Sequence, residues 1–380
     1  MQDSERQSPL WAKLMVIAGA VLMLTSGTAL AGVTVLRERY EGAIDQRDLF
    51  DAGQPEREPG EDISGPLNIL LAGLDTRPSR PDETPRSDTV IVVHVTADLR
   101  GAYMISLPRD ALVEIPAYEP ASFPGRQQDR LNAAMYHGAE PEPGEDKPDV
   151  ARGFALLSRT VSQLTGIDHF DAGAVINFVG FRDIVDAMGG ITVELDQVIE
   201  SRHRQPDGKH RGILADGSGY YGPQMVYQPD TPPCGRADDD GAFVCDLNGW
   251  QALDIARQRY GVEDSDYGRQ RNQQLILEAM MEKALSRDMV TDPLALDQVL
   301  RAAGASLIFD GRGHSPVDFA FALRRVRPGN LVTVQVDAGS LIEGGQYQGE
   351  ELRPRTHELF AALQDGRLEE FLLENRDLVQ

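Results

Sequence analysis

The stretch LNILLAGLD (Leu67–Asp75) decides the fold class. It is a short apolar run closed by a turn, a pattern that predicts a buried β-strand. Two more runs, TVIVVHVTA (Thr89–Ala97) and GAYMISLP (Gly101–Pro108), are predicted to be strands as well. The turn between them, at Asp98–Gly101, makes these two strands neighbours in one sheet.

Helical and extended patterns alternate along the rest of the chain. Apolar residues from Val150 to Leu164 recur at three- and four-residue spacing, which predicts an amphipathic helix over 149–167. Strands are expected over 172–178, 191–195 and 331–336, and helices over 179–190, 248–260, 269–287, 293–307, 315–326 and from about 356 onward. Strands that alternate with helices predict an α/β fold with helices on both faces of the sheet.

The N-terminal segment is not typical of a globular domain. No residue from Leu14 to Leu36 carries a formal charge, and a helix of about 20 apolar residues can span a bilayer. We therefore expect a cytoplasmic tail over 1–13, a transmembrane anchor over 14–36, an extracytoplasmic linker over 37–65, and a domain over 66–380. A cleaved signal peptide is the alternative, because Ala29–Ala31 resembles a cleavage site. Either reading exports most of the chain.

The chain has two cysteines, Cys234 and Cys245, in a stretch rich in Gly, Asp and Pro. Outside the cytoplasm, a lone pair this close in sequence favours a disulfide that holds an irregular loop. A zinc site is disfavoured, because no histidine lies near the two thiols.

The composition is strongly acidic, with 37 Lys and Arg against 60 Asp and Glu and a formal net charge of −23. Such a surface repels DNA and RNA, so nucleic acid is not an expected partner. Yet the stretch 256–274 gathers Arg257, Arg259, Arg269 and Arg271 around an acidic loop. This cluster is either a solvated charged helix or an anion site, since a guanidinium group binds phosphate oxygens two at a time.

Acidic and basic residues also occur together at three predicted strand ends, where open α/β sheets bind ligands. These pairs are Asp75 with Arg77, Arg86 with Asp88, and Arg109 with Asp110. If the strands are neighbours, Asp75 and Asp88 converge, and two carboxylates with phosphate oxygens and water suit Mg²⁺. For any single Asp, a turn or helix cap is the simpler interpretation. No nucleophile elbow, P-loop or histidine ligand spacing is present.

Seven motifs, in order along the chain, resemble the LytR-CpsA-Psr family. They are NILLAGLDTR (68–77), RSDTVIVVHV (86–95), MISLPRD (104–110), RLNAAMYHG (130–138), the segment 164–195, LNGWQALDIARQRY (247–260) and DYGRQRNQQ (266–274). The motifs cover the part 66–287, and 288–380 is expected to complete the fold. The resemblance implies a three-layer α/β/α sandwich with a central mixed sheet and an apolar groove for a lipid.

The resemblance also implies a membrane-anchored phosphotransferase whose catalytic domain is outside the cytoplasm. Members move glycopolymers, such as teichoic acids, capsule or arabinogalactan, from a polyprenyl pyrophosphate carrier to peptidoglycan. Two alternatives stay open. One is a non-catalytic protein that binds polyprenyl phosphate or a wall polymer, and the other is a polyprenyl pyrophosphatase with water as the acceptor.

The resemblance implies roles for individual residues. Asp75 and Asp88 match the family's metal-binding acids, which implies Mg²⁺ or Mn²⁺, and Arg109 matches a pyrophosphate-binding arginine; these three are the expected catalytic residues. The full set of expected pyrophosphate-binding side chains adds Arg77, Arg86, Arg130, Arg257, Arg259, Arg269 and Gln273. Many members have Arg where this chain has Asn272, so whether Arg271 takes its place stays open.

Overall fold

The structure is a computed structural model, and it describes residues 45–51, 62–76, 82–202, 209, 225–238, 240–258, 266–286 and 293–379. All of them belong to one compact unit, Ile44–Gln380. The expected tail and anchor over 1–36, together with Arg77 and Arg259, lie outside the described residues. Within the described part of the chain, no helix has the length and apolar character needed to cross a membrane.

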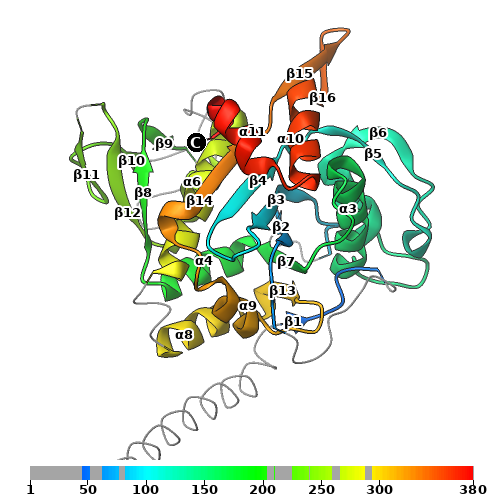
Figure 1. Cartoon of the computed structure of the whole chain (residues 1–380), viewed down its shortest axis with the longest axis horizontal. Coiled ribbons are helices and arrows are strands. Elements are labelled where there is room, and N and C mark those ends of the chain that lie inside the picture. Colours follow the sequence, from blue (N-terminus) through cyan, green and yellow to red (C-terminus); the bar gives the residue numbers. More distant parts are fainter. Residues whose placement is uncertain are drawn as a thin grey trace, which may run out of the picture. The chain divides into compact units, whose positions relative to one another are not determined.

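A mixed sheet of seven strands lies at the centre of the unit, in the order β1-β13-β7-β2-β3-β4-β14 (Figure 1). The strands are β1 (Asp45–Gln46), β2 (Leu67–Leu74), β3 (Ser87–Val95), β4 (Ala102–Leu107), β7 (Ala172–Asn177), β13 (Leu307–Asp310) and β14 (Leu331–Gln335). β3 is antiparallel to both β2 and β4. β7 runs parallel to β2, and β14 runs parallel to β4.

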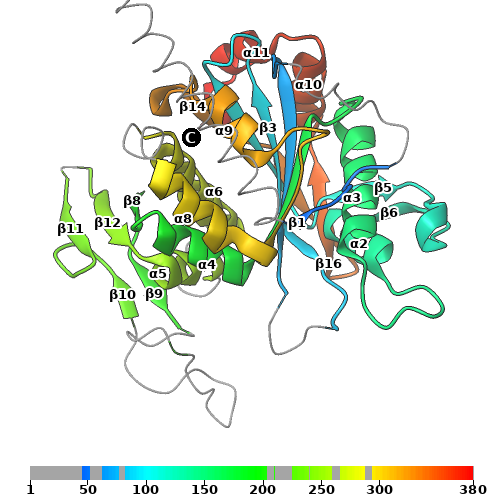
Figure 2. The ribbon, with the colours of Figure 1, turned by 90° about the horizontal axis from the view of Figure 1, so that it is seen from below.

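Helices cover both faces of this sheet, as Figure 2 shows along the sheet edge. One face packs on α2 (Leu131–Ala139), α3 (Val150–Thr165), α10 (Pro354–Gln364) and α11 (Leu368–Glu374). The other side holds α4 (Phe178–Ala187), α5 (Gly249–Arg257), α6 (Asp266–Leu285), α8 (Pro293–Ala303) and α9 (Pro316–Leu323). Successive residues of a strand point to opposite faces, so Leu70 and Ala72 enter the first core while Ile69 enters the second. The predicted α/β/α layering is confirmed.

The linker expected over 37–65 includes residues that are part of the folded unit. β1 pairs in parallel with β13, and Leu49 and Phe50 are buried in the main core. The Phe50 ring lies 5.6 Å from the ring of Phe154 and 6.3 Å from that of Phe170. Two apolar residues in a polar, acidic segment gave no periodic signal, but their burial attaches 45–51 to the fold.

The segment 196–246, which holds the two cysteines, contains short strands where the structure describes it. β8 (Ile191–Leu195), β12 (Phe243–Leu247) and β11 (Cys234–Ala237) form one sheet, and β9 (Ile199–Ser201) pairs with β10 (Met225–Tyr227). Cys234 and Cys245 face each other across β11 and β12 and are joined by a disulfide. The bond therefore links two paired strands, not the irregular loop that the composition suggested.

Two hairpins that the sequence patterns did not reveal complete the fold. β5 (Leu112–Ile115) pairs with β6 (Arg126–Arg130), and β15 (Ala338–Glu343) pairs with β16 (Gln346–Leu352). The second hairpin follows directly after β14, at the edge of the sheet where β2 and β4 end.

Candidate functional site

The C-terminal ends of β2 and β4 and the N-terminal end of β3 lie side by side. These strand ends form the edge of the central sheet that carries the candidate site. Leu74, the last residue of β2, pairs with Ser87, and Asp75 and Asp88 follow these two positions in sequence. On the other side of β3, Val90 pairs with Leu107, so the same register puts Asp88 opposite Arg109. β2 and β3 are neighbours, as the expected convergence of Asp75 and Asp88 requires, and each of the two acids contacts a different arginine, Arg257 and Arg109 respectively.

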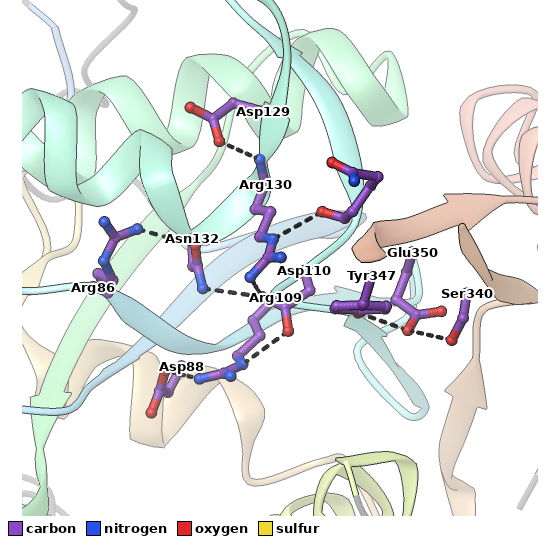
Figure 3. Close-up of polar contacts among 11 residues, drawn as sticks. Arg86, Asp88, Arg109, Asp110, Asp129, Arg130, Asn132, Ser340, Tyr347 and Glu350 are labelled. Carbon is purple, nitrogen blue, oxygen red and sulfur yellow. Dashed lines mark hydrogen bonds and ion pairs between the residues drawn. The ribbon is translucent and has the colours of Figure 1, made fainter. Parts of the chain in front are cut away.

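Arg109 connects two of the acids at this edge (Figure 3). Its Nη1 donates to Asp88 Oδ1 at 2.6 Å, and its Nε lies 3.4 Å from Asp110 Oδ2. The side chains of Arg109 and Asp88 are only 16% and 15% exposed. A charge-assisted hydrogen bond between partly buried groups fixes their geometry more firmly than a surface pair does.

Arg86 and Asn132 extend this network toward α2. Arg86 Nη1 donates to Asn132 Oδ1 at 3.4 Å, and the Asn132 amide nitrogen reaches Asp110 Oδ1 at the same distance. The Arg86 guanidinium also lies 4.5 Å from the centre of the Tyr136 ring. Asn132 and Tyr136 were not expected site residues, although both lie within the quoted motif RLNAAMYHG.

Arg130, the last residue of β6, also contacts this network. Its Nη1 lies 3.7 Å from Asp110 Oδ1, and its Nε donates to the main-chain oxygen of Gln348 at 3.0 Å. Its guanidinium lies 5.2 Å from the centre of the Tyr347 ring. The β15–β16 hairpin therefore borders the site, which no motif had indicated.

Arg257 reaches the same edge from the C-terminal end of α5. Its Nη2 lies 3.7 Å from Asp75 Oδ1, and its guanidinium lies 4.3 Å from the centre of the Phe178 ring. An aromatic face next to a guanidinium is a favourable cation–π contact. Arg257 and Asp75 are 22% and 30% exposed, so both remain accessible to a ligand. The polar residues at this edge are together called the polar cluster: Asp75, Arg86, Asp88, Arg109, Asp110, Arg130, Asn132 and Arg257.

One side chain of α6, that of Gln273, contacts the helix that bears Arg257. Gln273 Nε2 donates to the main-chain oxygen of Ala256 at 3.1 Å, and Gln273 Oε1 accepts from Thr89 Oγ1 at 3.2 Å. Gln273 therefore bridges the residue before Arg257 and the residue after Asp88. Both ends of the Gln273 amide group are therefore engaged by protein groups in the structure.

The other α6 positions differ from one another. Arg269 is 4% exposed and Asn272 is 1% exposed. Arg271 Nη2 lies 3.7 Å from Asp196 Oδ1, just after β8. Arg271 thus contacts the segment that follows β8, whereas Asn272 occupies the buried position where relatives were expected to have arginine.

A cavity of about 240 Å³ adjoins the polar cluster on the α4–α6 side of the sheet. Its lining is almost entirely apolar and comes from β2, β3, β7, α4, α5 and α6. Phe178 lines it and contacts Arg257, and Thr89 and Ala256 line it and are the sequence neighbours of Asp88 and Arg257. Gln273 also lines it and hydrogen-bonds to Thr89 and to Ala256. Two apolar helix segments, 154–164 and 178–185, are ordinary core by default and would border a lipid groove only by the family resemblance; of these, 178–185 contributes Phe178 and Phe181 to the cavity. The other, 154–164, packs in the main core.

The metal expectation rests on Asp75 and Asp88. Among the described residues, no group of three or more His, Cys, Asp and Glu side chains could hold a metal ion. Two carboxylates at neighbouring strand ends nevertheless fit Mg²⁺ chemically, because this ion commonly takes one or two carboxylates and completes its shell with phosphate oxygens and water. The donor set therefore suits Mg²⁺ that arrives with, or binds together with, a phosphate ligand.

Fold and site together define an α/β protein with an arginine-rich strand edge beside an apolar cavity. The chain belongs to the LytR_cpsA_psr family, whose model matches residues 38–364. A relative from Enterococcus faecalis, polyisoprenyl-teichoic acid–peptidoglycan teichoic acid transferase TagU, is 27% identical over 289 residues, which cover 74% of each chain. The cell wall biosynthesis protein LcpA of Corynebacterium glutamicum is 24% identical over 91% of this chain and 64% of its own length.

Solved structures agree with the fold. Bacillus subtilis TagV superposes with a TM-score of 0.53 at 20% identity, covering 81% of this chain and 98% of TagV. TagT bound to LI-WTA gives a TM-score of 0.51 at 23% identity, covering 82% and 93%. The family and the fold expected from the motifs are thereby confirmed.

Proposed function

We propose that this protein transfers a glycopolymer from a polyprenyl pyrophosphate carrier to a hydroxyl group of peptidoglycan. The observation that carries the proposal is the contact between the arginine-rich strand edge and the apolar cavity. Such a site fits a ligand with an anionic head and an apolar tail. The relative TagU is named as a transferase of teichoic acid to peptidoglycan, which supports this direction of chemistry. The substrate implies a domain at the outer face of the cytoplasmic membrane.

The charge distribution supports a local anion site. In a chain of net charge −23, four guanidinium groups lie at one sheet edge, from Arg86, Arg109, Arg130 and Arg257. Guanidinium groups bind phosphate oxygens in pairs with fixed geometry. The pyrophosphate would lie at this edge, and the first isoprene units would enter the cavity lined by Phe178.

The proposed reaction is a direct phosphoryl transfer. The acceptor hydroxyl oxygen forms a bond to the phosphorus next to the glycan, and the bond from that phosphorus to the bridging oxygen breaks. Polyprenyl phosphate leaves with the bridging oxygen, and the hydroxyl proton passes to the carboxylate of Asp75 or Asp88. Arg109 and Arg257 stabilise the negative charge that develops on the phosphate oxygens.

Asp75 and Asp88 would also hold Mg²⁺. When bound, the ion supplies positive charge that offsets the pyrophosphate and the two acids. The protein's own arginines orient the phosphates, and the cavity keeps the lipid away from water.

The test is reconstituted transfer from a synthetic polyprenyl pyrophosphate saccharide to peptidoglycan oligomers, followed by mass spectrometry. Asp88→Asn should abolish transfer, whereas Asp98→Asn should not, because Asp98 is 61% exposed in the turn between β3 and β4. EDTA should reproduce the loss, and Mg²⁺ or Mn²⁺ should restore activity. Wild-type transfer by the Asp88 variant would refute the proposal. If water accepted the phosphoryl group in place of peptidoglycan, the protein would instead be a pyrophosphatase.

A further inference from the structure

The tip of the β15–β16 hairpin carries two exposed apolar side chains side by side. Ile342 is 63% exposed and Tyr347 is 42% exposed. The two residues are direct partners across the antiparallel pair, so their side chains lie on one face of the hairpin. Exposed apolar side chains that adjoin each other at a site need an explanation, unlike isolated ones.

The Tyr347 ring is held in a fixed orientation. Its hydroxyl donates to Glu350 Oε1 at 2.8 Å, and Ser340 Oγ donates to the same oxygen at 3.0 Å. Glu350 is only 6% exposed, and burial, with the nearby carboxylates, raises the pKa of Tyr347, so its hydroxyl stays a donor. A ring fixed in advance loses little entropy when a ligand covers it.

This hairpin is continuous with the polar cluster. The Glu350 N–H donates to the main-chain oxygen of Asp110 at 2.8 Å, and Arg130 connects to both Gln348 and the Tyr347 ring. Figure 3 shows Tyr347 and Glu350 beside Asp110 and Arg130. A ligand lying across Ile342 and Tyr347 would therefore reach toward the strand end that bears Arg109.

We propose that Ile342 and Tyr347 form a platform for the sugar rings of the acceptor glycan. The proposal rests on the transferase function above, and it identifies the surface that guides the acceptor hydroxyl toward the pyrophosphate. An aromatic face with negative quadrupole attracts the positively polarised C–H groups of a pyranose ring.

The charge of the hairpin favours a neutral saccharide over other occupants. Glu343 and Glu351 are exposed on the same two strands, and carboxylates repel an anionic membrane surface. Among the described residues, Arg130 is the basic residue that contacts the Tyr347 ring, and its charge is already paired with Asp110. A neutral sugar chain combines apolar ring faces with hydroxyl groups and matches this mixture.

The experiment measures binding of chitotetraose, a soluble chain of N-acetylglucosamine rings, to the full-length protein in detergent by saturation-transfer NMR titration. Ile342→Ser should weaken binding about tenfold, because it removes an apolar contact. Leu373→Ser is the matched control, since Leu373 is 61% exposed on α11, and it should leave binding unchanged. Titration with inorganic pyrophosphate should be the same for both variants and the wild type.

The outcomes separate this inference from the proposed function. Equal chitotetraose affinity for the two variants, or no binding by the wild type, would overturn the platform. So would a loss of vesicle binding or of self-association, with unchanged sugar affinity, in the Ile342 variant. If sugar binding behaves as expected while reconstituted transfer fails, the platform stands and the transferase proposal falls.

Discussion

At the scale of single residues, the site places each arginine beside an acid, an aromatic ring or both. Arg109 pairs with Asp88, and Arg257 lies between Asp75 and the Phe178 ring. This preorganisation favours anion binding, because a guanidinium group that is already oriented loses less conformational entropy when an anion binds. The acids at the same time limit the repulsion among neighbouring arginines.

Arg257 provides the prediction at this scale. Arg257→Ala should weaken binding of inorganic pyrophosphate roughly 10- to 100-fold, because it removes a charge-assisted contact in a partly desolvated site. Arg257→Lys should restore only part of the affinity, since an ammonium group lacks the planar fork. The measurement is calorimetric titration of the full-length protein.

Arg100→Ala is the control for that titration, because Arg100 is 75% exposed at the opposite edge of the sheet. If Arg257→Ala and Arg100→Ala changed the affinity equally, the arginine-rich stretch would be a solvated helix surface. That was the competing interpretation of the sequence.

The sequence pointed to site residues in two ways: by their position at predicted strand ends, and by their place in the arginine cluster or in the motifs. Asp75, Asp88 and Arg109 were found because each lies at the end of a recognisable strand. Tyr347 was missed, because no spacing in the sequence indicates that residues more than 200 positions after Arg130 return to it. Parallel pairing of β14 with β4 causes this return, since it brings the chain after β14 to the same sheet edge.

At the scale of elements, the long apolar runs were predicted correctly and the short edge pieces were not. β2, β3, β4 and β7 carry enough buried residues to be recognised without their partners. β1 has two residues and β13 has four, and such strands are stabilised by pairing more than by their own pattern. Leu307 is an example. It begins β13, whereas the sequence pattern placed it in a helix over 293–307.

The C-terminal end of α5 provides the prediction at this scale. Gln273→Leu removes the donor to Ala256 oxygen and the acceptor for Thr89, so the Arg257 end of α5 should lose its fixed position. We expect pyrophosphate affinity to fall several-fold and stability to fall by about 0.5–1.5 kcal/mol, the usual net contribution of a hydrogen bond, because the lost bonds join partly buried groups. Titration and thermal unfolding measure the two effects.

Thr89→Val tests whether Gln273 acts by position. It should lower pyrophosphate affinity in the same direction, because it breaks the bridge without touching the Gln273 amide. Gln163→Leu, an exposed change on α3, should alter neither quantity. An unchanged affinity in the Thr89 variant would return Gln273 to a direct phosphate contact, as the family resemblance implied.

At the scale of the whole domain, the two edges of the central sheet have different roles. The edge where β2 and β4 end carries the arginines and acids of the site. The opposite edge carries a compact network in which His94 Nδ1 lies 2.8 Å from Asn68 Oδ1, while the Asn68 N–H donates to Asp171 Oδ2 at 2.7 Å. This separation lets residues of the second network affect stability without touching the site.

His94 provides the prediction at this scale. Burial lowers the pKa of His94 below its ordinary value, against a smaller opposing effect of the Asp171 charge. The unfolded chain then binds more protons than the folded one once the pH falls below about 6.5, so stability should decrease as the pH falls through that range. His94→Gln cannot take up this proton, and its unfolding temperature should change less between pH 7.5 and pH 5.5. Because the two edges are separate, inorganic pyrophosphate affinity at pH 7.5 should match that of the wild type. An identical pH dependence in both proteins would remove His94 as the cause.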